Sequence, residues 1–107
     1  MSAVALTRSF KETLFEDIRR NPDFREALLR EAINVLLAGE VDVGKGVLRD
    51  YINATIGFEK LGAKVKISPK SLMRMFGPKG NPQAKNLFAV LSALQKDAGI
   101  ELHIAAE

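Results

Sequence analysis

Residues 58–76, which read FEKLGAKVKISPKSLMRMF, place the strongest constraint on how this chain folds. Ser68 followed by Pro69 predicts the start of a helix, because the serine hydroxyl can accept a backbone N–H and proline has a helical φ. Apolar residues recur at helical spacing on both sides of this start, at Phe58, Leu61, Val65, Leu72, Met75 and Phe76. The stretch therefore predicts two short helices joined by a tight turn at Lys66 and Ile67.

The second helix of this pair is expected to present polar side chains on its outer face. Its outward positions are Lys70, Ser71, Met73 and Arg74. Gly62 in the first helix allows the second helix to cross closely over its backbone. Two helices, a short turn and such a face are typical of a helix-turn-helix, whose second helix fits the major groove of B-DNA. The alternative is an antiparallel helical pair that contributes only to the core, and periodicity alone does not separate the two.

The charge of the chain is distributed unevenly, although its net value is only +3. Residues 60–96 contain eight Lys and Arg and no Asp or Glu, whereas residues 1–59 contain eight basic and ten acidic residues. An acid-free segment that coincides with the helical pair indicates a surface that binds a polyanion. A solvated basic face is the alternative, and the coincidence with the helical pair favours DNA.

Two helices are predicted over residues 1–40. Ser9 and Glu12 have the form of a capping box, which places the start of the first helix at Ser9. Asn21 as a cap and Pro22 at the first helical position predict the start of the second. The expected buried positions of the two helices are Phe10, Leu14, Ile18, Phe24, Leu28, Ala32, Val35 and Leu36.

Residues 42–98 are predicted to hold the DNA-binding core. Asp42 is expected to cap a helix that two glycines interrupt, with Val43, Val47, Tyr51 and Ile52 facing inward. The last helix is expected to begin at Asn81 and Pro82 and to end before Gly99. Its expected inward positions are Ala84, Leu87, Phe88, Leu91 and Leu94.

Residues 100–104, IELHI, alternate between apolar and polar side chains, which predicts one short strand. A solitary strand needs a partner, and the candidates are the same strand in a second copy and an edge of a different protein. The predicted fold is therefore all-α, a single domain over residues 1–107 with about six helices and one short C-terminal strand. Residues 1–40 are then free to form a dimer interface or a partner interface.

Three segments of the chain resemble a known family: LRDYINATIGFEKLG, SPKSLMRMFGPKGNPQAKNLFAVLSALQ and GIELHI. They look like the HigA-like addiction-module antidotes, which are antitoxins with a lambda-repressor (Xre-type) helix-turn-helix. The resemblance covers about residues 24–104. The family usually has glycine in the turn, where φ is positive, and this chain has Lys66 there.

The resemblance implies a homodimer that binds a palindromic operator and represses its own operon. It also implies a partner, a small ribonuclease toxin of the RelE superfamily, which the antitoxin neutralises. Some relatives are stand-alone regulators without a toxin. A different class of function, a helical protein-interaction module that does not bind DNA, is the further alternative.

The candidate DNA contacts fall into two groups. Arg74 is a candidate base reader because guanidinium can pair bidentately with guanine, and Lys70 and Ser71 lie in the first turn, where the groove is entered. The resemblance carries the same three positions over as base readers. Ser71 has a local alternative, a hydrogen bond at the helix N-terminus. The candidate phosphate contacts are Lys60, Lys64, Lys66, Lys79, Asn81 and Lys85.

No catalytic constellation is visible in the sequence. Residues 39–46 nearly match a phosphate-binding loop, but Gly46 stands where a hydroxyl is required and a helix precedes the segment instead of a strand. His103 is the only histidine and there is no cysteine, so neither a metal site nor a nucleophilic triad can be assembled. We therefore expect a protein that is not an enzyme and needs no cofactor or metal. The lack of cysteine, of a long apolar run and of a secretory signal predicts a cytoplasmic, nucleoid-associated protein without a membrane segment.

Overall fold

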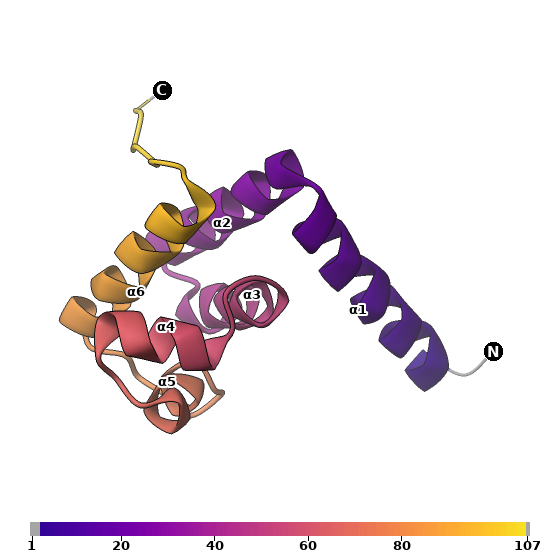
Figure 1. Ribbon diagram of the computed structural model, residues 1–107, viewed down its shortest axis with the longest axis horizontal. Helices are drawn as coiled ribbons and strands as arrows, with labels where there is room; N and C mark the ends of the chain where they lie inside the picture. The colour runs from indigo at the N-terminus through magenta and orange to yellow at the C-terminus, as the bar shows by residue number, and fades with distance from the viewer. Residues whose placement is uncertain (1–2, 107) are drawn as a thin grey trace.

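The computed structural model describes the backbone of residues 3–106 and the side chains of residue 10 and residues 12–106. This part of the chain contains six helices and no strand (Figure 1). The helices are α1 (Ala3–Arg20), α2 (Pro22–Leu37), α3 (Val41–Ala54), α4 (Phe58–Val65), α5 (Pro69–Met75) and α6 (Ala84–Ala98). The prediction of an all-α chain of six helices is confirmed for these residues.

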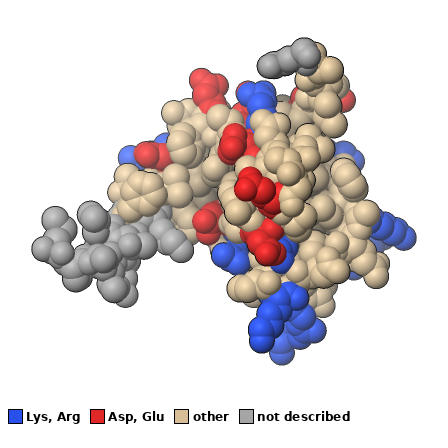
Figure 2. All heavy atoms as spheres, turned by 180° about the vertical axis from the view of Figure 1, so that it is seen from behind, with Lys and Arg blue, Asp and Glu red and all other residues tan. Residues whose placement is uncertain are grey.

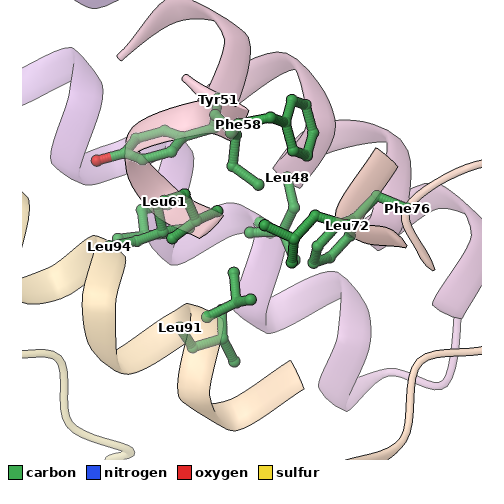
Figure 3. Close-up of a cluster of buried hydrophobic side chains, with 12 residues drawn as sticks. Leu48, Tyr51, Phe58, Leu61, Leu72, Phe76, Leu91 and Leu94 are labelled. Atoms are coloured by element: carbon green, nitrogen blue, oxygen red, sulfur yellow. The ribbon is translucent and has the colours of Figure 1, made fainter. Parts of the chain in front are cut away.

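The helices α2 to α6 surround one apolar core, and α1 extends away from it as an arm (Figure 1). α2 packs against α3, α4 packs against both α5 and α6, and α1 contacts α2 and α3. In Figure 3 the side chains of Leu48, Leu72 and Phe76 point toward one another. The fully buried core also includes Leu29, Ala32, Ile52, Leu61, Val90 and Leu94. Tyr51 lies in the same core, and its burial raises the pKa of the phenol.

The two short helices and the turn between them have the predicted boundaries. Ser68 caps α5, because its Oγ accepts the backbone N–H of Ser71 at 3.2 Å. Lys66 forms the turn in the left-handed region with φ 59°. A Cβ on Gly62 would lie 2.5 Å from the carbonyl oxygen of Ile67, so this position admits only glycine without a shift of the turn. Gly62 therefore allows the turn, and with it the start of α5, to lie directly against α4.

Three predicted helix starts are wrong. α1 begins at Ala3, so Ser9 is inside the helix, and the Ala, Leu and Arg residues before it have high helix propensity. α3 begins after Glu40, and it is continuous through both glycines. Asp42 is inside its first turn, where its carboxylate lies 3.2 Å from the Lys45 ammonium. α6 begins after Gln83 and not at Asn81 and Pro82.

Three of the large apolar residues expected in the core are exposed. They are Phe10 at 67%, Val43 at 55% and Phe88 at 66%. Phe10 belongs to the projecting arm, while Val43 is turned outward because α3 presents Gly44 to α2, where a Cβ would lie 2.6 Å from Leu36. On α6, Val90 is buried with Leu91 and Leu94, which turns Phe88 and Ala84 to the outside.

Residues 100–104 form no strand within the described chain, so the predicted strand is not confirmed. α6 ends before Gly99, as predicted, and Gly99 caps it with φ 69°. Beyond it Ile100 and Leu102 pack against the core, and the end of the described chain points away from the helices (Figure 1). Among the residues that the structure describes, no helix combines the length and the hydropathy that a bilayer span requires.

Candidate nucleic-acid interface

The outer face of α5 carries the four side chains that the sequence places there. Lys70, Ser71, Met73 and Arg74 are all exposed. Ser71 has a local role as well, because its Oγ accepts a hydrogen bond from the hydroxyl of Ser68 at 2.9 Å. Its own hydroxyl proton is left to donate outward. The local hydrogen bond of Ser71 is therefore compatible with a base contact by the same side chain.

An open hollow of about 500 Å³ connects α5 with the segment that follows it. Ser71 and Arg74 line one side of this hollow, and Lys79 and Asn81 line the other. The structure thus brings candidate base readers and candidate phosphate contacts to one surface. Arginine, lysine, amide and hydroxyl donors on one concave surface can bind phosphate oxygens and base edges together.

The loop between α5 and α6, residues 76–83, is attached to α3 by two cations. Lys45 Nζ donates to the carbonyls of Gly77 at 3.1 Å and Gly80 at 2.6 Å, and its side chain is only 3% exposed. Arg49 Nη1 donates to the carbonyl of Phe76 at 3.0 Å. These bonds hold the loop, and with it Lys79, in a fixed position beside α5.

Glycine at position 80 allows the same loop to pack under the end of α5. A Cβ built on Gly80 would collide with the carbonyl oxygens of Arg74 and Met75. Because these acceptors are backbone atoms, the collision could be relieved only by moving the loop. Gly80 and Lys45 therefore fix the loop from two sides.

The sequence interpretation missed the role of Lys45, which it considered only within the failed phosphate-binding loop. One signal was present: Lys45, Leu48 and Ile52 share one helical face, and both apolar residues are fully buried. A lysine on such a face is buried only where carbonyls or carboxylates receive its protons. The carbonyls that do so are 32 and 35 residues away in the sequence.

The six candidate phosphate contacts are all exposed, but they are not equivalent. Lys64 Nζ lies 3.9 Å from a carboxylate oxygen of Asp97 on α6, so it has an acidic neighbour within the fold. Lys79 and Asn81 lie beside Arg74 in the hollow. Within the described chain, no ion pair or hydrogen bond engages the side chains of Lys60, Lys66 and Lys85.

The exposed charge is unevenly distributed on the surface. Figure 2 shows a group of basic side chains at the lower end of the molecule, where α5 and the loop after it lie, and acidic side chains across the middle of the same face, with further basic side chains beside them and toward the edges. Residues 60–96 contribute eight cations and no acid. Of these eight, Lys64 alone is ion-paired among the described residues.

The described residues contain no group of three or more His, Asp or Glu side chains placed to hold a metal ion. Comparison with protein-family models, with curated proteins and with solved structures finds no match to this chain.

Proposed function

We propose that this chain is a sequence-specific DNA-binding regulator of transcription. In this proposal α4 and α5 are the two helices of an Xre-like helix-turn-helix, and α5 enters the major groove. The observation that carries the proposal is the set of exposed cations on an acid-free segment of 37 residues, centred on a short helix with a polar outer face. Such a surface is complementary to a polyanion with a groove of fixed width.

The side chains of the interface have different roles in this proposal. Arg74 pairs with a guanine, and Lys70 and Ser71 contact bases where the helix enters the groove. Lys79 and Asn81 contact phosphates from the loop that Lys45 and Gly80 hold in place. Lys60, Lys66 and Lys85 add phosphate contacts, and Lys64 contributes least because Asp97 already lies beside it.

The resemblance to HigA-like antitoxins supports a more specific proposal. The regulator acts as a homodimer on a palindromic operator in the cytoplasm, represses its own operon and binds a toxin of the RelE superfamily. A single recognition helix reads few base pairs, which favours two half-sites about one helical turn apart. No catalytic step is proposed for any residue of the chain.

One observation favours the alternative, a helical module that binds another protein and no DNA. Large apolar side chains are exposed on three helices, at Phe10, Leu37 and Phe88. A partner protein would cover such side chains. In this alternative the basic face would bind an acidic protein surface.

A salt titration of duplex binding separates the two functions. If about five phosphates are contacted, log affinity should fall against log salt with a slope of about −4.5. The interaction module predicts no affinity for the duplex at any salt concentration. Lys79→Ala should make the slope shallower by about 0.9, which is the contribution of one phosphate.

Lys64→Ala is the matched control for this titration, because it removes a lysine that is ion-paired with Asp97. We expect its slope to change less than that of Lys79→Ala. If Lys64→Ala and Lys79→Ala change the slope equally, the hollow beside α5 has no special part in binding. Absence of duplex binding at low salt would exclude the proposed function itself.

A further inference from the structure

The helix proposed to enter the major groove, α5, is too short to determine its own position. It has seven residues, and an isolated helix of fewer than about 12 residues is marginal in water. Its orientation therefore depends on the burial of Leu72 and on the contacts that hold its two ends. At the N-terminal end the turn lies against Gly62, where a Cβ would be 2.5 Å from the carbonyl oxygen of Ile67. At the C-terminal end the contacts are made by two cations of α3.

Arg49 holds the C-terminal end of α5. Its Nη1 donates to the carbonyl of Phe76, the residue that caps α5, at 3.0 Å. Phe76 is fully buried and Arg49 is partly buried, so this bond joins α3 to the end of α5 within the fold. Arg74, the candidate base reader, lies two residues before Phe76, and its carbonyl accepts the N–H of Gly77 at 3.1 Å. The backbone of Arg74 is therefore bonded to the same short segment that Arg49 holds.

Lys45 holds the loop that follows α5. Its Nζ donates to the carbonyls of Gly77 at 3.1 Å and Gly80 at 2.6 Å, and it lies 3.2 Å from a carboxylate oxygen of Asp42. All three protons of the ammonium therefore have acceptors, and the side chain is only 3% exposed, so Lys45 cannot contact DNA itself. Lys79 lies between the two glycines and is exposed. A buried lysine thus sets the position of an exposed one.

We propose that Arg49 and Lys45 are positioning residues for DNA recognition and that their functions differ. Arg49 acts through Arg74 and determines how well the preferred sequence is distinguished from other sequences. Lys45 acts through Lys79 and determines how many phosphates are contacted. This inference rests on the proposed function, because it adds to the interface of α5 two residues that do not touch DNA.

The two functions differ because base contacts and phosphate contacts differ in the geometry that they require. A bidentate arginine–guanine pair needs both donors aligned with O6 and N7, and such a group has to be held within about 0.5 Å and 10–20° of its productive geometry. A lysine–phosphate contact tolerates changes of angle, because the ammonium is a point charge on a flexible stem. Loss of the bond to Phe76 frees the end of α5 and misaligns Arg74. Loss of the bonds to the loop instead removes Lys79 from the reach of a phosphate.

Methionine substitutions test the two functions, because methionine removes the charge and keeps a long, flexible side chain. The probes are a duplex that the unmodified chain selects from a random pool and a random duplex. For Arg49→Met, affinity for the selected duplex should fall about tenfold, with little change on the random duplex and an unchanged salt slope. For Lys45→Met, both affinities should fall and the slope should become shallower by about 0.9. Fluorescence anisotropy at several salt concentrations measures all four quantities.

Arg19→Met is the matched control for lost stability. Arg19 Nε donates to the carbonyl of Ala54, the last residue of α3, at 3.3 Å, so it makes the same kind of bond as Arg49. It belongs to α1, which lies away from α5 (Figure 1). With every variant folded by circular dichroism at the temperature of the titration, Arg19→Met should change neither the ratio of the two affinities nor the slope. Equal effects of Arg19→Met and Arg49→Met would overturn the inference.

Double-mutant cycles test whether each positioning residue acts through its proposed partner. In an Arg74→Ala background, Arg49→Met should leave the ratio of the two affinities unchanged, because the group that it positions is absent. In a Lys79→Ala background, Lys45→Met should cause no further change of slope. Additive effects in either cycle would overturn the function assigned to that residue. Arg49 is only partly buried, so its cycle can be measured even if Lys45→Met does not fold.

Failure of this inference can be distinguished from failure of the proposed function. Absence of duplex binding by the unmodified chain at low salt would exclude the function and this inference with it. Duplex binding whose ratio and slope are unaffected by both methionine substitutions would exclude the inference alone.

Discussion

The cations of residues 1–59 and those of residues 60–96 are used differently, although each segment contains eight. In the first segment the structure gives internal partners to Arg19, Arg25, Arg30, Lys45 and Arg49. In the second segment the described chain gives an ion pair to Lys64 alone. Among the described residues, five cations of the first segment thus have partners within the fold, whereas one cation of the second segment does.

The difference follows from where helices end. The last carbonyls of a helix have no intrahelical partner, and cations are favoured beside them. Arg25 donates to the carbonyl of Arg19 at 3.0 Å, and Arg19 donates to the carbonyl of Ala54 at 3.3 Å. Lys45 and Arg49 do the same for the carbonyls that follow α5. A basic side chain whose role is structural can therefore be recognised by the helix end beside it.

The largest expected effect on stability comes from removing a cation that has partners within the fold. Lys45→Ala leaves the partly buried carbonyl of Gly80 without the Lys45 donor and leaves that of Gly77 with only the N–H of Gly80, which should lower the free energy of unfolding by about 3 kcal/mol. Urea denaturation measures this. Lys60→Ala is the matched control, since an exposed lysine should change stability by no more than about 0.5 kcal/mol. Equal effects of the two substitutions would remove the distinction between the two segments.

Removing a cation that has no ion pair within the fold should affect DNA binding and not stability. Arg74→Ala should leave stability nearly unchanged and cost about 1–3 kcal/mol of binding on the preferred DNA sequence, with little loss on random DNA. Titration of both duplexes measures the difference. Arg30→Ala is the control, because Arg30 is ion-paired with Glu26 on α2 at 3.5 Å. Equal losses on both duplexes would reduce Arg74 to a phosphate contact.

Two identical dipeptides show how far local sequence predicts this fold. Asn21 and Pro22 begin α2 as predicted, and Asn21 Oδ1 accepts the backbone N–H of Asp23 at 3.0 Å. Asn81 and Pro82 carry the same signal, yet α6 begins two residues later. The chain before Asn81 is held by Lys45 and packed under α5, so the backbone at this point follows tertiary contacts and not its own capping preference.

The candidate site could likewise be predicted only where local sequence determines it. The outer face of α5 follows from local signals, namely the cap at Ser68 and the spacing of Leu72, Met75 and Phe76. The hollow that joins α5 to Lys79 could not be predicted, because it depends on carbonyls that meet α3 only after folding. The face of α6 that turns inward could not be predicted either. Apolar residues at positions 87, 88, 90 and 91 are compatible with burial of either face.

The smallest expected effect concerns the one non-glycine residue with positive φ among those described, Lys66. Lys66→Gly should raise the free energy of unfolding by about 0.5–1 kcal/mol, because glycine adopts the left-handed region without the steric cost that a Cβ imposes there. Lys60→Gly removes the same charge from inside α4 and should instead lower stability by about 1 kcal/mol. Both variants replace a lysine by glycine. Chemical denaturation should nevertheless show a higher free energy of unfolding for Lys66→Gly and a lower one for Lys60→Gly.

The same pair of variants also bears on DNA binding. If Lys66 contacts a phosphate, Lys66→Gly should weaken duplex binding and make the salt slope shallower by about 0.9, even though the fold becomes more stable. If Lys66→Gly gains stability and loses affinity for the duplex, Lys66 belongs to the cations that contact DNA. A loss of stability in Lys66→Gly as large as in Lys60→Gly would instead show that the turn does not hold this residue in the left-handed conformation in solution.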